Sequence, residues 1–181
     1  MSITSPFLFW LLFGCVVVSS QDRRLPSRLG SKLVEAIQER TCPPACPSGW
    51  LRFGDFCYFY SRHKSNAVTA TSFCRGKRSV LVWFDNLREL NFVQEHMTLA
   101  RWTWIGLDVR PFEGTLLPVW TSPEGGDTEQ LPWLNKATGH GHVSTANCVA
   151  YFKPDAKVGH YLHFYPCSYS YYFVCKKSAL F

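Results

Sequence analysis

The sequence predicts an α+β domain that is held together by disulfide bonds. Two segments without helix breakers follow an aromatic strand-like segment, and short strand-like runs come after them. Because the strands do not alternate regularly with helices along the chain, this order is typical of an α+β fold. Eight cysteines in 181 residues indicate a small protein that is stabilised by disulfides in an oxidising compartment.

Residues 1–20 are predicted to be a secretory signal peptide. The apolar run from Pro6 to Val18 is shorter than the ~20 residues of a membrane-spanning helix, and Val18-Ser19-Ser20 offers a cleavage site before Gln21. A signal anchor is the alternative, because residues 1–5 contain no Lys or Arg. The basic residues after the run would then place the domain in the cytosol, which conflicts with the number of cysteines. We therefore expect a secreted, extracellular protein whose mature chain has no membrane span.

Residues 21–45 form a short basic neck or linker. Leu29, Leu33 and Ile37 recur every four residues, which indicates a short helix that would be marginal on its own. A frayed linker is the other interpretation. The prolines of Cys42-Pro43-Pro44-Ala45-Cys46-Pro47 cannot continue a helix, so we expect the domain to cover residues 46–181.

The first half of the domain is predicted to contain a strand pair, two helices and an extended segment between them. The strand pair lies within Trp50–Tyr60, the first helix over 66–75 and the extended segment over 79–84. Asp85 is predicted to cap a second helix over 86–99. Apolar residues recur along one face of that helix and acidic residues lie on others: Leu87, Leu90, Val93 and Met97, against Glu89 and Glu95.

The second half is predicted to consist of strands around a long loop. Arg101–Leu107 is a strand-like run, and residues 108–147 are rich in proline and glycine. A loop of this length in a compact domain is usually functional. Three further strand-like runs close the chain: Cys148–Phe152, Tyr161–Tyr165 and Tyr172–Lys177.

Several short motifs occur in a fixed order through this region. They are Cys46-Pro47-Ser48-Gly49-Trp50, Cys57-Tyr58, Trp104-Ile105-Gly106-Leu107, Val119-Trp120-Thr121, Trp133, Cys148-Val149 and Phe173-Val174-Cys175. Together they resemble the C-type lectin-like domain family in its long form, over residues 46–177. The resemblance implies that family's fold, with two helices and small antiparallel sheets around a long loop.

The resemblance also implies the pairing of the cysteines, which their number alone leaves open. The implied disulfides are Cys46–Cys57, Cys74–Cys175 and Cys148–Cys167. Cys42 has no partner in this scheme, so an interchain disulfide and a homodimer are predicted. Capping of Cys42 by a small thiol, or competition with Cys46 for Cys57, is the alternative.

The calcium site of the family is predicted to be absent from this chain. Calcium needs oxygen ligands, which the family supplies from three motifs around the long loop. Here those motifs fall on Ala137-Thr138-Gly139, on the residues ending in Asn147 and on Leu162-His163-Phe164, and no Asp or Glu occurs from Leu131 to Cys148. We expect no cofactor and no bound metal. Zinc at the four nearby histidines is the less favoured alternative: His140, His142, His160 and His163.

The predicted function is a secreted recognition module that binds a carbohydrate or a glycoprotein or protein ligand without calcium. We expect no enzymatic activity and no catalytic residues, because no Ser/His/Asp order, phosphate-binding loop or paired carboxylate accompanies the histidines. A disulfide-linked structural or toxin-like subunit is the alternative. The candidate ligand-binding residues are Trp133, Lys136, His140, His142, Asn147, Tyr161 and His163.

The net charge of +6 comes from scattered basic residues. Such a distribution does not favour a nucleic-acid partner, although it suits an acidic partner such as a sulfated glycan.

Overall fold

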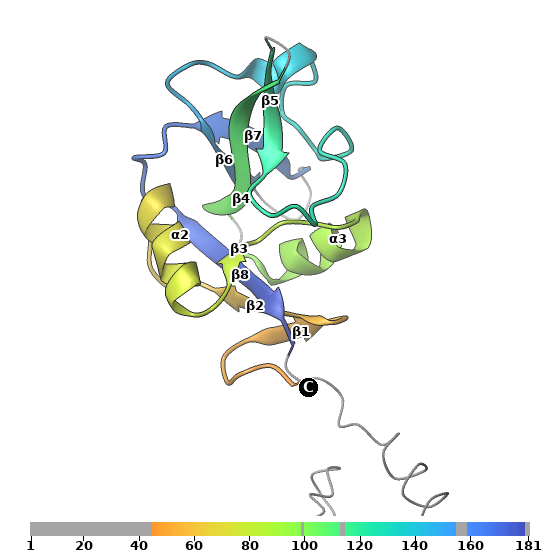
Figure 1. Cartoon of the computed structure of the whole chain (residues 1–181), viewed down its shortest axis with the longest axis vertical. Helices are drawn as coiled ribbons and strands as arrows, with labels where there is room; N and C mark the ends of the chain where they lie inside the picture. The colour runs from red at the N-terminus through yellow and green to blue at the C-terminus, as the bar shows by residue number, and fades with distance from the viewer. Residues whose placement is uncertain (1–44, 99, 113–114, 155–158, 180–181) are drawn as a thin grey trace, which may run out of the picture. The chain divides into compact units, whose positions relative to one another are not determined.

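The computed structural model describes residues 45–98, 100–112, 115–154 and 159–179. The predicted signal peptide over 1–20, and the predicted neck as far as residue 44 with its Cys42, lie outside these residues. Residues Cys46–Ala179 belong to one compact unit, which is drawn in colour in Figure 1. Among the helices described, none is long and apolar enough to cross a membrane.

Eight strands are joined into one sheet by hydrogen bonds. The main path runs β1-β2-β8-β4-β6-β7, with β3 paired to β8 and β5 paired to β4. The β4–β8 pair is parallel and the other pairs are antiparallel. With two helices, this confirms the predicted α+β class. The strands are β1 (Leu51–Phe53), β2 (Phe56–Tyr60), β3 (Val80–Leu81), β4 (Arg101–Phe112), β5 (Thr115–Trp120), β6 (Cys148–Lys153), β7 (Tyr161–Tyr165) and β8 (Tyr172–Ser178).

Helices α2 (Ala67–Gly76) and α3 (Leu87–His96) occupy the two predicted helical segments. The predicted cap of the second helix is wrong by one residue, because Asn86 and not Asp85 accepts the N–H of Glu89, at 3.0 Å. Asn86 and Glu89 have the spacing of a capping box, which favours Asn86 at this position. Helix α3 ends at His96, short of the predicted residue 99, because Met97 is extended.

The predicted loop from residue 108 begins later than expected. Strand β4 continues to Phe112 and forms a hairpin with β5, in which Pro118 lies opposite Val109. Proline indicated a loop because it lacks an N–H. Strand β5 pairs only with β4, however, and an edge strand tolerates proline. The irregular part of the long loop is therefore residues 121–147.

Two clusters of buried side chains fill the space on either side of the sheet strands. One contains α2 residues with Trp104, Ala150 and Phe173, and the other contains α3 residues with Tyr58, Tyr151 and Leu162. Gly106 lies where β4 crosses the segment after β3, and a Cβ there would be 2.7 Å from the Leu81 carbonyl oxygen. Glycine is thus required for the close approach of the two backbones.

The three disulfides implied by the family resemblance are present: Cys46–Cys57, Cys74–Cys175 and Cys148–Cys167. Cys74–Cys175 joins α2 to β8 across 101 residues. In the chain-entropy description, a loop of that length stabilises the folded state by about 4–5 kcal/mol. Cys148–Cys167 ties the start of β6 to the turn after β7, below the long loop.

Glu89, which was predicted to lie on another face of α3 than its apolar residues, is buried. Its carboxylate accepts hydrogen bonds from the Tyr58 hydroxyl and the Asp85 N–H, and forms an ion pair with Lys176. Burial lowers the pKa of the Lys176 ammonium, and contact with Glu89 opposes that shift. Buried charges are rare unless they are paired, and here both partners are less than 5% exposed.

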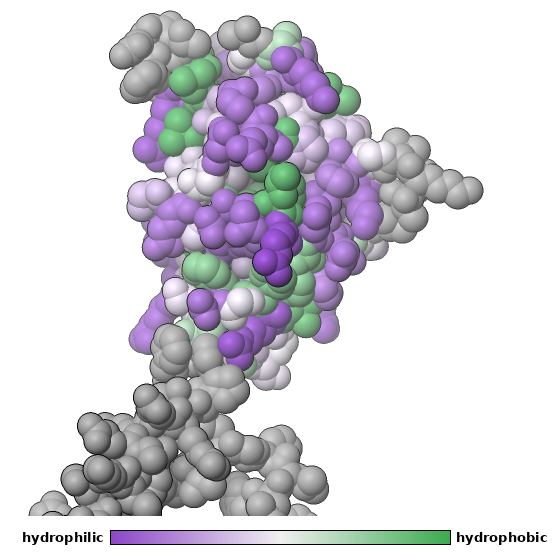
Figure 2. Space-filling view, turned by 90° about the vertical axis from the view of Figure 1, so that its right-hand side faces the viewer, coloured by the Kyte–Doolittle hydropathy of each residue, from purple (hydrophilic) through white to green (hydrophobic). Residues whose placement is uncertain are grey.

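Polar residues cover most of the side of the domain seen in Figure 2, and apolar residues form only small areas there. The large apolar side chains that are exposed include Leu87 on α3 and Leu134 in the long loop.

Candidate functional site

The long loop between β5 and β6 is anchored to the domain by backbone hydrogen bonds. The Gly126 N–H donates to the Phe84 carbonyl at 2.8 Å. Further along, the Leu134 N–H donates to the carbonyl of Leu162 at 3.0 Å, and the Leu162 N–H donates to Pro132 at 2.9 Å. The middle of the loop therefore runs beside β7 and pairs with it through a short parallel bridge between Trp133 and Leu162.

Trp133 is the buried support of the loop. It is 4% exposed, and its indole N–H donates to the Thr128 carbonyl at 2.8 Å. Its ring stacks on His140 with centroids 4.3 Å apart and planes 9° apart, and it also stacks on Phe164 at 5.2 Å. Since these contacts cover the indole, we assign Trp133 a positioning role and not a free stacking surface for a sugar.

His140 occupies an unusual backbone conformation in the short helix η2 (Thr138–Gly141). Gly139, His140 and Gly141 have φ values of 73°, 50° and 75°, in the left-handed region. A non-glycine residue there is strained and persists only when its surroundings hold it. The Trp133 stack supplies that support, and the His140 Nε2 lies 3.2 Å from a Glu129 carboxylate oxygen. Strained residues of this kind are often found in binding loops.

A pocket of about 330 Å³, which we call the loop pocket, opens beside this stack. It is lined by Glu129, Gln130, Leu131, Pro132, Trp133, Lys136 and His140. The Glu129 side chain is 67% exposed and Lys136 is exposed, so an acceptor and a donor face the same space. Such a pair can form hydrogen bonds with the hydroxyl groups of a ligand without a metal ion.

His142 and Asn147 form a second polar pair at the end of the loop. The His142 Nε2 and the Asn147 Oδ1 are 2.8 Å apart, and the imidazole edge contacts Phe164. Phe164 contacts His142 directly and is connected to His140 through the ring of Trp133, which places both histidines of the loop on one side of β7.

The two remaining candidates, Tyr161 and His163, lie on the opposite face of β7. Side chains alternate along a strand, so they point away from Leu162 and Phe164. Tyr161 contacts Trp102, and His163 contacts Tyr165. These aromatic residues continue to Phe152, Tyr169 and Tyr171 and form one half-buried to exposed aromatic face. The seven candidate residues are thus divided between two faces.

The division affects the chemistry of the histidines. Burial lowers the pKa of His163, and burial together with the charge of Lys153 lowers the pKa of His160. His160 contacts Tyr151, while His163 faces the aromatic side of the sheet. The two pairs of histidines, which were expected to approach one another, do not converge on one site. No three His, Cys, Asp or Glu side chains in the described part of the chain lie where they could share a metal ion.

None of the three calcium motif positions carries a carboxylate. Leu162 is 0% exposed and Phe164 is 3% exposed, and both belong to the hydrophobic core. Ala137 precedes η2, and Gly139 has no side chain. The side-chain oxygen of Asn147, at the remaining motif position, contacts His142, so these positions offer few of the oxygen ligands that calcium needs.

Sequence reasoning missed Glu129, which contributes the carboxylate of the loop pocket. It lies two residues before the stretch without acids, and only the fold of the loop brings it back to His140. The aromatic face was missed in part, because Trp102 and Tyr171 come from distant segments. Their only signal in the sequence is the richness in aromatic residues of their own runs.

Comparisons with known proteins agree with this architecture. A family model described as "Lectin C-type domain" matches residues 63–177. The chain is 32% identical over 141 residues to C-type lectin domain-containing protein 87 of Caenorhabditis briggsae, which covers 74% of this chain and 60% of that protein. It is 30% identical over 166 residues to the protein of the same name in Caenorhabditis elegans, with coverages of 88% and 69%.

Among solved structures, the C-type lectin domain of murine dendritic cell inhibitory receptor 2, in complex with N-glycan, has the same fold. The TM-score is 0.62 at 19% identity, over 74% of this chain and 99% of that one. The C-type lectin-like fold inferred from the sequence motifs is thereby confirmed. The chain spans 60% of the length of the Caenorhabditis briggsae relative.

Proposed function

The chain belongs to the C-type lectin domain family, and from this we propose that it is a secreted module that recognises a carbohydrate or glycoprotein or protein ligand without calcium. Domains of this family typically recognise carbohydrate or protein ligands and are generally not enzymes. Calcium independence, secretion and the use of the loop pocket are the specific parts of the proposal.

The observation that carries the proposal is the set of side-chain contacts inside the long loop, at positions that offer no carboxylate to a metal ion. A calcium ion would need several oxygen ligands, and the corresponding positions hold Leu162, Phe164 and Gly139. The His140–Trp133 stack and the Glu129 contact connect η2 to the rest of the loop instead. These contacts support a loop whose shape does not depend on calcium.

Recognition in the loop pocket would rest on hydrogen bonds. Glu129 can accept from ligand hydroxyls, and Lys136 can donate to them. The His142–Asn147 pair lies further along the same loop and can contribute a second set of polar contacts. Hydrogen bonds that involve a charged group are stronger than neutral ones, so this pocket offers its best contacts to a hydroxylated ligand.

Secretion is supported by the chemistry of the domain. Three disulfides, one of which closes 101 residues, form and persist in oxidising compartments. The apolar run in residues 1–20 agrees with this location.

The test is binding of the mature chain to a glycan array and a glycoprotein panel, with and without a calcium chelator. We expect the same ligands and the same affinities in both conditions. The double substitution Glu129→Gln with Lys136→Gln should weaken binding about tenfold, since it removes two charge-assisted contacts. Glu95→Gln with Arg88→Gln is the matched control, because both side chains are exposed on α3 and the net charge is likewise unchanged.

Calcium-dependent binding would overturn the proposal. An equal effect of the two double substitutions would show that the ligand does not use the loop pocket.

A further inference from the structure

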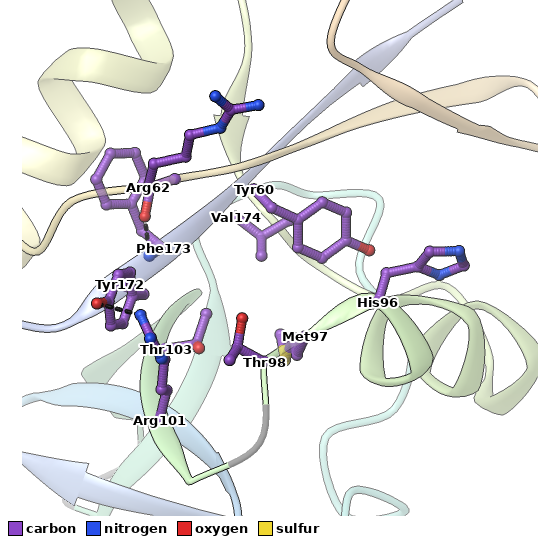
Figure 3. A pocket seen from close by; sticks show the side chains of 11 residues that line it. Tyr60, Arg62, His96, Met97, Thr98, Arg101, Thr103, Tyr172, Phe173 and Val174 are labelled. Atoms are coloured by element: carbon purple, nitrogen blue, oxygen red, sulfur yellow. Dashed lines mark hydrogen bonds between the residues drawn. The ribbon is translucent and has the colours of Figure 1, made fainter.

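A second pocket, which we call the basic pocket, lies beside the C-terminal end of α3 (Figure 3). It has a volume of about 220 Å³ and is bordered by the end of β2, the start of β4 and β8. Arg62 follows β2, Thr98 follows α3, Arg101 and Thr103 lie on β4, and Tyr172 lies on β8. It shares no lining residue with the loop pocket.

Positive charge is concentrated around this pocket without a carboxylate to balance it. The Arg101 guanidinium lies 4.6 Å from the centre of the Tyr172 ring, and the Lys64 ammonium lies 5.6 Å from the same centre. Lys153 stands opposite Arg101 in the β4–β6 register. Among the described residues, no Asp or Glu lines the pocket, and the ion pairs found are His140–Glu129 and Lys176–Glu89. Like charges repel when they are gathered in this way, and a bound anion would relieve that repulsion.

The polar groups of the basic pocket are donors that suit a tetrahedral anion. Arg101 donates to the Tyr172 hydroxyl and stacks on its ring, so its guanidinium is held in place with further N–H groups free to donate. Thr103 is only 4% exposed, and Figure 3 shows it between Arg101 and Thr98 on one side of the pocket. Arg62 lines the opposite rim, and its guanidinium points away from the pocket. The Arg101 guanidinium and the two threonine hydroxyls can therefore donate to the oxygen acceptors of a sulfate ester, while Arg62 adds positive charge at the rim.

The volume and the remaining lining favour a sulfate that is attached to a sugar. The space would hold several groups the size of a water molecule (~30 Å³ each), more than a single anion requires. Tyr60 and Met97 supply apolar surface beside the charged groups. Such surface can contact the C–H face of a sugar ring.

We propose that the basic pocket binds a sulfate group of a sulfated glycan, at a site separate from the loop pocket. The Arg101 guanidinium and the threonine hydroxyls receive the sulfate oxygens, Arg62 attracts the anion from the rim, and Tyr60 and Met97 contact the ring. Lys64 and Lys153 attract the next anionic groups along the chain of the glycan.

The test is surface plasmon resonance of the mature chain on immobilised heparin oligosaccharides and on the same oligosaccharides after desulfation. We expect desulfation to weaken binding at least about tenfold. Arg62→Gln with Arg101→Gln should weaken binding to the sulfated form by about tenfold or more, because the charge-assisted hydrogen bonds of Arg101 and the attraction of the Arg62 charge are both lost. Arg75→Gln with Arg88→Gln is the control, since both arginines are exposed, lie outside the basic pocket and change the net charge equally.

A third substitution, Thr103→Val, removes a hydroxyl from the pocket and leaves the charge unchanged. It should lower the affinity for the sulfated oligosaccharide without lowering the weak affinity for the desulfated one. Thermal unfolding of each variant confirms that it is folded before its affinity is compared.

Three outcomes would overturn the proposal. The two double arginine substitutions could lower the affinity for the sulfated oligosaccharide equally, or Thr103→Val could leave that affinity unchanged. A DNA duplex of similar charge could also bind as tightly as the sulfated oligosaccharide. Glu129→Gln should leave heparin binding unchanged. A failure of the loop-pocket proposal would therefore leave this one standing, and the reverse also holds.

Discussion

At the scale of single residues, the buried charges of Glu89 and Lys176 are the most consequential feature of the core. The ammonium of Lys176 lies 3.1 Å from the centre of the Trp83 ring and 4.0 Å from that of Phe56, beneath the Glu89 carboxylate. Burial, together with the hydrogen bond to Glu89, raises the pKa of the Tyr58 hydroxyl, which therefore stays protonated and donates. The pair adds a charged link from α3 to β8 and β2 to the apolar contacts between these elements.

We predict that Lys176→Met lowers the free energy of unfolding by about 3–5 kcal/mol, because it leaves the Glu89 carboxylate buried and unpaired. Lys176→Met combined with Glu89→Gln should recover much of that loss, since the amide oxygen can still accept from Tyr58 and Asp85. Denaturant unfolding measures both values.

Lys177→Met is the matched control for this prediction. Lys177 is the next residue on β8, and its ammonium lies on the outer side over the Trp50 ring, 4.4 Å from its centre. Its loss should change stability by about 1 kcal/mol or less. If Lys176→Met and Lys177→Met lowered the free energy of unfolding by similar amounts, the burial of the Glu89–Lys176 pair would not be the cause of the loss.

At the scale of elements, η2 determines the shape of the loop pocket. Its three successive left-handed residues bring the His140 ring onto Trp133 and hold Asn135 close to Gly141. A Cβ at Gly141 would lie 2.8 Å from the Asn135 side-chain amide nitrogen. The conformation thus depends on glycine both for φ and for space.

We predict that Gly141→Ala destabilises the domain by about 1–2 kcal/mol and disturbs the Trp133 environment. Thermal unfolding and near-ultraviolet circular dichroism measure the two effects. Gly159→Ala is the control, because a Cβ at Gly159 would meet no other atom within 4 Å and its φ lies outside the left-handed region. If the two variants had the same unfolding temperature and the same near-ultraviolet spectrum, η2 would not be a strained segment that its side-chain contacts hold in place.

At the scale of the whole molecule, the structure contains three disulfides within the domain, and an interchain disulfide through Cys42 stays a prediction. The three intradomain bridges use six of the eight cysteines. Cys15 lies in the predicted signal peptide, which leaves Cys42 as the odd cysteine of the predicted mature chain. An odd cysteine in a secreted protein is typical of an intermolecular bond. A covalent pair of domains would present two copies of each pocket to one ligand and so raise the avidity for a repeated glycan.

We predict that the mature protein migrates as a dimer on a non-reducing gel and as a monomer after reduction. Cys42→Ser should abolish the dimer and leave the thermal unfolding of the domain unchanged, because Cys42 precedes residues 46–179 in the sequence and all six cysteines among those residues are paired with one another. A monomer band for the unsubstituted protein would contradict the prediction.

The sequence by itself determined the α+β class and most helix and strand positions, and its motifs determined the family, whose resemblance implied the disulfide pairing. The signals are alternation in strands, segments without helix breakers, and the run Trp104-Ile105-Gly106-Leu107. Strand β5 was missed because Pro118 indicated a loop. The prediction that the calcium site is absent also rests on the sequence alone, because no Asp or Glu occurs from Leu131 to Cys148.

Only the tertiary structure decided how the candidate residues are grouped. It buried Trp133 under His140, brought Glu129 into the loop pocket and placed His163 on the opposite face of β7. It also joined Arg62, Arg101 and Tyr172, which come from three separate strands or strand ends, into the basic pocket. These groupings depend on the register of β4, β6, β7 and β8 and on left-handed backbone at His140. Both arise from long-range packing, which no local pattern of residues encodes.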